Sequence, residues 1–401
     1  MQLEMIKESE LNELLKDKKI DFVATVISHW HAIGLDAFLY DHFINNNKIQ
    51  GIILIQPHSE NGYIINEKDF AFRNFNDSNI YYIDENFFYP HRKNNNLLIK
   101  SAEFFYQYFK PILNKVMFYN KKYNNIFLIY PWFPTINLIK KIFLHNNLSK
   151  KYSPHMIIID EGIGTYISDE ASKIVIGSNI SFKDKIKNLL DISLASFERK
   201  ILSNNVPIQT RFLFRSSIKN SNNLKRRFEV NNDIVNSYKR ILKIRKKNLH
   251  IKSTNTIIFL SQPYSEYCLC SLEDELMIIE SLVQFLVNNN FSIILKLHPR
   301  EYEGKYDRII EKYNIEKIPQ DFPIEDIFSG FKPICVIGTL STGLINANLF
   351  FDLKSISIVD MIISFAKIEI LKVSADEFRS IAGDMVLYAE DFKKLISLIR
   401  N

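Results

Sequence analysis

The feature that most constrains the fold is a repeated alternation of short apolar runs with helical patterns. Apolar runs of strand length lie at residues 21–28, 49–56, 79–84 and 125–130, and a fifth ends at residue 161. Helical patterns separate them, at residues 35–43, 97–118 and 136–145. Strands that alternate with helices are joined by right-handed crossovers and form a parallel sheet covered on both faces. The first part of the chain is therefore predicted to be a Rossmann-like domain.

The same alternation starts again near residue 254. Further strands are predicted at residues 256–262, 292–297, 333–338 and 355–359, with helices at 271–287, at 306–313 and from 342. Ser271 and Asp274 resemble a capping box, so the acids of the LEDE run are interpreted as helix-start charges. A chain of 401 residues exceeds the usual size of one core. We expect an α/β protein with domains at 1–180 and 254–401, joined by a mainly helical connector at 181–253.

Charge is concentrated in the connector. From Ser181 to Lys252 there are 18 Lys or Arg against 5 Asp or Glu, whereas the whole chain carries +6. Such a segment could contact an acidic polymer or anionic lipid, or could be a solvated face. Nucleic acid is disfavoured because the segment lacks interleaved aromatic residues for base stacking.

Three cysteines are too few for a disulfide framework, and a lone Cys-x-Cys is a poor zinc site. The charged N-terminus does not resemble a signal peptide, and no apolar run reaches the ~18 residues of a membrane span. We expect a cytoplasmic protein, with peripheral docking on the membrane as an option.

Polar residues follow the predicted strand ends. In HMIIIDEGIGTY a buried strand delivers Asp160 and Glu161 to its carboxyl end, where ligands bind in open α/β sheets, and Gly162 allows a sharp turn. The third glycine of a dinucleotide motif is missing, which argues against NAD or FAD. His29 follows the first strand. Two roles are open for it: a contact with a sugar, or a place in a structural turn.

In the second domain, His298 and Pro299 follow one strand. The loop GTLSTG, from Gly338 through Ser341 and Thr342, follows another. Each feature alone suits a turn or a helix cap, but their joint occurrence at strand ends predicts one site.

These motifs resemble those of bacterial sialyltransferases of the GT-B type. IDEGIGTY, LSQPY, LKLHPRE and VIGTLSTGL are most similar to the capsule polysialyltransferases of glycosyltransferase family 38, and the family 52 lipooligosaccharide enzymes share the acid and His-Pro motifs. The resemblance implies two Rossmann-like domains facing each other across a cleft. It also implies inverting transfer of sialic acid from CMP-sialic acid to a sialylated or galactose-terminated glycan.

By this resemblance, Glu161 is the general base that takes the acceptor hydroxyl proton, with Asp160, Gly162 and His29 on the acceptor side. His298 would donate to the leaving phosphate.

Pro299 would aim the His298 imidazole, and Ser341, Thr342 and Gly338 would bind phosphate oxygens. Gln262 and Pro263 are expected near the cytidine. No Asp-x-Asp pair occurs, so we expect transfer without a metal or other cofactor.

Three functions remain open at this point. The first is a polysialyltransferase for capsule polysaccharide. The second is a single-addition sialyltransferase on a galactose-terminated glycan. The third, of another class, is a non-catalytic binding module for acidic polymers, which would give Glu161 no role.

Overall fold

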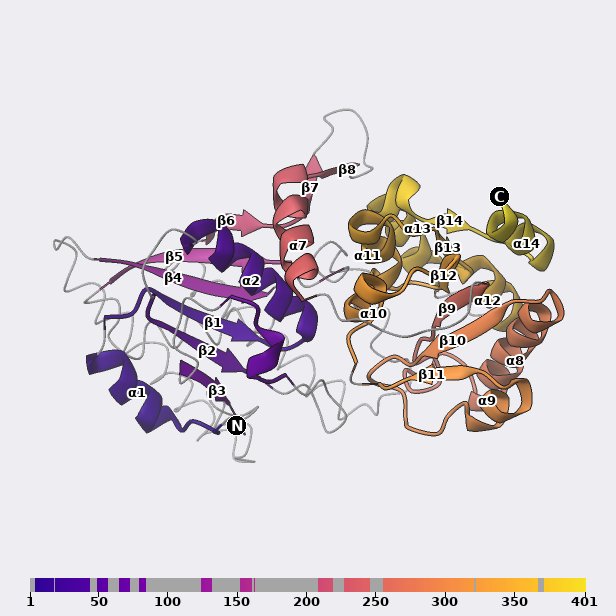
Figure 1. Cartoon of the computed structure of the whole chain (residues 1–401), viewed down its shortest axis with the longest axis horizontal. Helices are drawn as coiled ribbons and strands as arrows, with labels where there is room; N and C mark the ends of the chain where they lie inside the picture. Colours follow the sequence, from indigo (N-terminus) through magenta and orange to yellow (C-terminus); the bar gives the residue numbers. More distant parts are fainter. Residues whose placement is uncertain are drawn as a thin grey trace, which may run out of the picture. The chain divides into compact units, whose positions relative to one another are not determined.

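The chain folds into two compact units (Figure 1). The computed structural model describes residues 4–17, 19–43, 49–56, 65–72, 79–83, 124–131, 152–160, 162, 208–218, 227–245, 255–320, 322–366 and 371–401. The first unit comprises Met1–Glu161 and Ile180–Leu213, and the second comprises Gly162–Asn179 and Phe214–Asn401. This division assigns the segment 181–253 to both units, whereas the sequence predicted a separate connector.

The first unit is built on a six-stranded sheet whose strand pairs are parallel. Its order is β3-β2-β1-β4-β5-β6, the strand order of a Rossmann fold. The strands are β1 (Phe22–Val26), β2 (Gly51–Ile55), β3 (Ile80–Tyr82), β4 (Asn124–Pro131), β5 (Tyr152–Ile159) and β6 (Ile208–Phe212). β1 and β2 are buried along their whole length, as expected for central strands covered on both faces.

Helices cover both faces of this sheet. On one face lies α2 (His29–Phe43), whose Phe38 ring meets the rings of Phe127 and Phe212 edge to face. On the other face, α1 (Glu8–Asp17) contributes the buried side chains of Leu11 and Leu15 to an apolar cluster.

Polar contacts fix two peripheral segments of the first unit to its helices and strands. Asp36, fully buried within α2, accepts hydrogen bonds from the backbone N–H groups of Ala71 (2.5 Å) and Phe72 (3.3 Å), just after the 3₁₀ turn η1 (Glu67–Asp69). At the sheet edge, Tyr82 N donates to Glu4 O and Ile6 N donates to Tyr82 O, both at 2.9 Å. The segment before α1 therefore pairs with β3.

The second unit repeats the Rossmann order, β11-β10-β9-β12-β13-β14, again with parallel pairs. Its strands are β9 (Thr256–Leu260), β10 (Ser292–Lys296), β11 (Glu316–Ile318), β12 (Cys335–Gly338), β13 (Ser355–Ser357) and β14 (Leu387–Tyr388). Its helices are α7 (Asn232–Ile244), α8 (Leu272–Asn288), α9 (Asp307–Tyr313), α10 (Ile324–Gly330), α11 (Thr342–Phe351), α12 (Val359–Ala366), α13 (Leu371–Ala382) and α14 (Phe392–Arg400), with the 3₁₀ turn η6 (Gly383–Met385).

One apolar cluster joins the helices and strands of this sheet. It includes Phe259 from β9, Leu286 from α8 and Leu395 from α14, each at most 2% exposed. Fully burying a side chain of this size contributes about 1.5–3 kcal/mol. The cluster therefore fixes the sheet whose carboxyl edge carries the His-Pro and Ser-Thr loops.

Part of the segment predicted as connector belongs to the second unit. β7 (Arg215–Ile218) and β8 (Arg227–Val230) form an antiparallel pair, followed by α7. Phe214 and Tyr238 pack against Phe350 of α11, with ring centroids 5.5 and 5.7 Å away. The segment thus contains strands, including β6 of the first sheet, where a mainly helical pattern was predicted.

Candidate active site

The candidate site in the second unit lies where β9 and β12 meet, the topological switch point of the sheet. Ligands bind at such points, outside the carboxyl ends of the strands. The polar residues that follow the strands are Ser261 after β9, His298 after β10 and Thr339 after β12. Sequence reasoning placed the His-Pro and GTLSTG loops at this edge, and in the structure they follow the carboxyl ends of β10 and β12.

His298 opens a β-turn whose second residue is Pro299. Glu301 N donates to His298 O at 3.0 Å, the bond that closes such a turn. The imidazole is half-buried, and its Nδ1 accepts the backbone N–H of Arg300 at 3.2 Å. A neutral imidazole that accepts at Nδ1 carries its proton at Nε2. His298 is therefore a hydrogen-bond donor through Nε2.

A buried acid that sequence reasoning did not assign lies beneath this turn. Glu301, 0% exposed, accepts the backbone N–H of His298 at 2.7 Å and the hydroxyl of Ser261. Burial raises the pKa of the Glu301 carboxyl, against the opposing effects of the Ser261 hydrogen bond and the Lys305 charge. The signal was present in the sequence, because a Glu three residues after a turn-opening residue can reach back to its N–H, as in a capping box.

The positive charge of Lys305 offsets part of the negative charge of Glu301 and two neighbouring carboxylates. Its Nζ lies 2.7 Å from Glu266, 2.7 Å from Glu275 and 3.2 Å from Glu301. Burial lowers the pKa of Lys305, but the hydrogen bonds to Glu266 and Glu275 and the charge of Glu301 outweigh burial and raise it overall. Within the described residues, these three carboxylates form the acidic group compact enough to hold a cation, and the ammonium of Lys305 bonds to all three.

The acids of the LEDE run lie in the first turn of α8, as predicted. Ser271 does cap α8, since its side chain accepts the N–H of Asp274 at 3.0 Å. Glu275 is also 1% exposed and binds Lys305, Tyr306 and Ser265 N, so in addition to its place at the helix start it is a buried ion-pair residue.

The loop after β12 begins α11 with a serine cap. The Ser341 side chain accepts the N–H of Gly343 at 3.1 Å, which leaves its own O–H able to donate. A Cβ at Gly343 would come within 2.8 Å of Leu260 Cδ1, so glycine permits this close packing. Thr342 is the first residue of α11 and is half-buried, whereas Gly338 is buried at the end of β12. Hydroxyls at the positive end of a helix dipole suit an anion.

The residues predicted near cytidine lie in a tight turn after β9. Tyr264 N donates to Gln262 O at 3.0 Å, Pro263 is buried and Gln262 is half-buried. The Tyr264 hydroxyl bonds to Thr339 Oγ1, which ties the β9 turn to the β12 loop.

The two cations that flank the His-Pro pair differ in exposure. Lys296 is buried and its Nζ donates to Leu297 O (3.0 Å) and Gln320 O (2.7 Å). Arg300 is exposed and donates to the Tyr267 hydroxyl at 2.7 Å. Lys296 thus braces the loop, while Arg300 lies at the surface.

In the first unit, Asp160 directly follows β5 and is fully buried. Its Oδ1 accepts the indole N–H of Trp30 at 3.1 Å, so Trp30 holds this acid from the start of α2. Gly162 has φ of +99°, a conformation that favours glycine, as the predicted sharp turn requires. Glu161, the predicted base, lies outside the described residues.

His29 lies at the start of α2 rather than in a loop. It is 5% exposed and its Nδ1 is 3.3 Å from Asp69 Oδ1. The structure therefore gives His29 an acidic partner that the sequence pattern did not reveal, while its contact with a sugar stays a prediction.

Some charges of the basic segment have internal partners. Arg215 is 5% exposed, and Arg245 Nε lies 3.5 Å from Oδ1 of the buried Asp326. Arg211, Arg240 and Lys243 are exposed. The exposed group remains compatible with an anionic partner.

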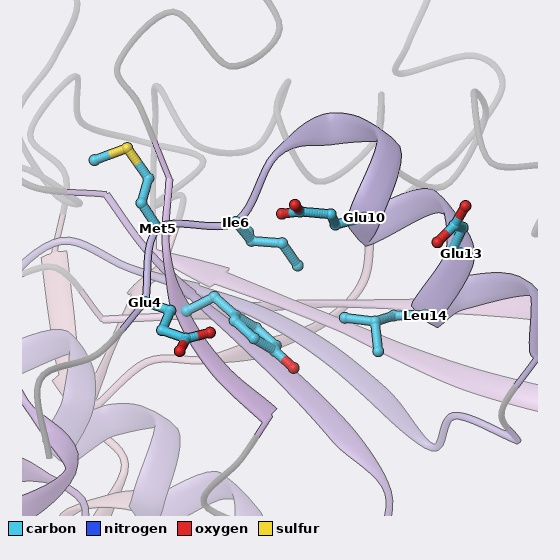
Figure 2. A pocket seen from close by; sticks show the side chains of 7 residues that line it. Glu4, Met5, Ile6, Glu10, Glu13 and Leu14 are labelled. Atoms are coloured by element: carbon cyan, nitrogen blue, oxygen red, sulfur yellow. The ribbon is translucent and has the colours of Figure 1, made fainter.

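A pocket of about 380 Å³ in the first unit contains none of the predicted site residues (Figure 2). It lies between α1 and β3, and its lining includes Glu4, Glu10, Glu13, Met5, Leu14 and Tyr81. Its carboxylates would repel an anionic sugar or a phosphate.

Two parallel six-stranded sheets, each with a Rossmann order, define an α/β fold of the GT-B type, as predicted. The chain is similar in fold to a putative UDP-N-acetylglucosamine 2-epimerase from Listeria monocytogenes, with 9% identity, coverage of 96% of this chain and 89% of that chain, and a TM-score of 0.50. It also matches an alpha/beta-galactoside alpha-2,3-sialyltransferase from Photobacterium phosphoreum, with 15% identity, 93% and 99% coverage, and a TM-score of 0.44.

The family follows from the sequence itself. The model of the alpha-2,8-polysialyltransferase family (POLYST) matches residues 22–360, and the chain belongs to this family. A search of curated proteins found no match. The protein is therefore a glycosyltransferase of the sialyltransferase class, and the resemblance predicted from the motifs is confirmed. Its class implies a nucleotide-sugar donor and a glycan acceptor.

No helix in the described part of the chain is long and apolar enough to cross a membrane.

Proposed function

We propose that this sialyltransferase moves sialic acid from CMP-sialic acid to a sialylated glycan, with inversion and without a metal, and so extends a polysialic chain for a capsule. The observation that carries the proposal is the grouping of donors at one edge of the second sheet. His298 presents Nε2–H there, and α11 presents its positive end with the hydroxyls of Ser341 and Thr342. Such a set suits a phosphate whose charge grows as it leaves.

In the proposed reaction, Glu161 takes the proton of the acceptor hydroxyl. The acceptor oxygen then bonds to C2 of sialic acid, while the bond from C2 to the phosphate oxygen breaks and CMP departs with the electron pair. His298 donates to that phosphate and Ser341 and Thr342 bind its oxygens. Gln262 and Pro263 would contact the cytidine.

The exposed basic side chains Arg211, Arg240 and Lys243 support two further parts of the proposal. They would hold an acidic acceptor chain, or keep the enzyme at the inner face of the membrane through anionic lipid.

The direct test is incubation with CMP-sialic acid and an oligosialic acceptor in the presence of EDTA, with products resolved by length. A ladder of products is expected. One added residue on a galactose-terminated acceptor would instead indicate a single-addition enzyme. Glu161→Gln should abolish turnover and leave CMP binding nearly intact, and a wild-type rate would show that another group is the base.

Two serine caps in the second unit allow a matched test of phosphate binding. Ser341→Ala and Ser271→Ala each remove a side-chain cap of a helix, at a cost of about 1 kcal/mol. Both variants should therefore lose similar thermal stability. We expect weaker CMP binding for Ser341→Ala alone, measured by calorimetry, and equal CMP affinities would remove Ser341 from the site.

A further inference from the structure

One carboxylate joins the ends of β9 and β10. Glu301 Oε2 accepts the backbone N–H of His298 at 2.7 Å and the hydroxyl of Ser261, the residue after β9. In return, Glu301 N donates to His298 O at 3.0 Å. Both backbone polar groups of His298 are thus bound by the residue three positions further on.

The second oxygen of Glu301 is held as firmly. Oε1 accepts the Tyr306 hydroxyl at 2.8 Å and lies 3.2 Å from Lys305 Nζ. Tyr306 and Lys305 are both buried, so these bonds lie away from competing water. The side chain is consequently fixed at both ends of its carboxylate.

Further contacts fix the rest of His298. Gln320 Nε2 donates to His298 O at 2.7 Å and to Glu301 O at 2.6 Å. Arg300 N donates to the imidazole Nδ1, and Pro299 restricts the backbone between them. The direction of Nε2 therefore depends on the geometry of this turn, which Glu301 holds from below.

We propose that Glu301 is a positioning residue for His298: it sets the turn so that the imidazole Nε2–H is aimed at the phosphate of the nucleotide. The inference rests on the proposed function of His298. Glu301 is fully buried and touches no ligand in this scheme, so it acts through His298 and not on the reacting atoms. A misplacement of a catalytic group by about 1 Å can cost on the order of 100-fold in rate.

The same cluster supplies a matched control. Glu275 is equally buried and binds the same Lys305 (2.7 Å) and Tyr306 (3.0 Å), but its other oxygen accepts the N–H of Ser265 instead of His298. Glu301→Gln and Glu275→Gln thus remove the same charge from the same cluster. They differ in which backbone N–H group loses its carboxylate.

The test compares the affinities of CMP and cytidine, which differ by the phosphate, in the full-length protein. We expect Glu301→Gln to lower the ratio of CMP to cytidine affinity by about tenfold, the loss typical of a charge-assisted hydrogen bond. Its cytidine affinity should stay at the wild-type value, and kcat should fall while KM for the acceptor stays constant. Glu275→Gln should keep both affinities within about twofold, although its melting temperature should fall as much as that of Glu301→Gln.

Equal effects of the two variants on the affinity ratio would overturn the inference, because the cluster would then act through stability alone. Ser261→Ala is the second variant, for the case that Glu301→Gln does not fold. It removes one of the two donors to Oε2 and also the hydroxyl oxygen that accepts the N–H of His298 at 3.3 Å, so a fall of about threefold in the ratio is expected, and an unchanged ratio contradicts the proposal. If wild-type protein binds CMP no better than cytidine, or transfers no sialic acid, the proposed function itself fails.

Discussion

At the scale of single residues, Trp30 and Asp160 form a buried pair that links the start of α2 to the end of β5. The 3.1 Å bond gives a partner to a fully buried acid that directly precedes the predicted base in the sequence. Removing one partner of a buried hydrogen bond leaves the other desolvated at a cost of about 1–3 kcal/mol. The pair therefore stabilises the acid motif as well as the fold.

Trp30→Phe should accordingly lower the free energy of unfolding by at least about 1–3 kcal/mol, because the indole N–H is lost and the smaller phenyl ring leaves part of the buried space empty. Urea unfolding followed by circular dichroism measures this. Asp160→Asn is the matched control, since its amide oxygen can still accept the Trp30 N–H, and it should lose less. A larger loss for Asp160→Asn would mean that the charge of Asp160, and not this bond, matters most.

A pH dependence belongs to the same scale. Burial raises the pKa of Glu301 in the folded protein, so its contribution to stability is fully present below about pH 4.5 and is lost as the pH rises through the raised pKa. The difference in unfolding free energy between the wild-type protein and Glu301→Gln should therefore decline as the pH rises through this window. The decline is about 1.4 kcal/mol for each unit by which the folded-state pKa lies above the unfolded value. The variant keeps Lys305, Glu275 and Glu266 around position 301 and removes only the Glu301 carboxyl.

Urea titrations of both proteins from about pH 4 to pH 8 would measure that difference. A difference that stays flat or rises with pH would show that the folded-state pKa of Glu301 is not raised.

At the scale of elements, the apolar runs predicted most of the strands. The structure has β1, β2, β4, β9, β10, β12 and β13 within a few residues of the predicted ranges, and the cap of α8 at Ser271. These strands are buried on both faces, so their sequences are nearly continuous apolar runs.

The elements that were missed lack such a signal. β6, β7 and β8 are short and carry polar side chains, as in IQTRF, RSSI and RFEV, so tertiary pairing and not local pattern makes them strands. The same holds for the site. The motifs predicted His298 and Ser341, but the buried cluster beneath His298 needs Glu266 and Glu275 to meet Lys305, and these residues lie 39 and 30 positions away from it in the sequence.

α7 is anchored to α10 by the ion pair of Arg245 with Asp326, whose side chains are 6% and 1% exposed. Arg245→Ala should cost about 3–5 kcal/mol, because it leaves a buried carboxylate without this partner. Lys243, exposed on the same helix, is the control, and Lys243→Ala should change stability by less than about 0.5 kcal/mol. Thermal unfolding of the two variants compares them, and similar melting temperatures would argue that the pair contributes little.

At the scale of the whole molecule, the family match from residue 22 to 360 spans both units. The residues proposed for acceptor and donor belong to different units, Asp160 to the first and His298 to the second. Both units are therefore expected to be needed for turnover.

The exposed basic side chains give a prediction at this scale. If they hold an acidic acceptor, KM for an oligosialic acceptor should rise steeply between 0.1 and 1 M salt, as the Debye length falls from about 10 to about 3 Å. KM for a neutral galactose-terminated acceptor serves as the control and should change little. Equal salt responses of the two acceptors would assign these charges to lipid or to solvent.

The pairing of Glu4 and Ile6 with Tyr82 has a consequence for handling the protein. An exposed strand edge is a template on which other chains can add strands and aggregate. Because the segment before α1 covers part of this edge, deleting it would uncover backbone groups of β3 and favour precipitation during expression. A purification tag should therefore not replace this segment.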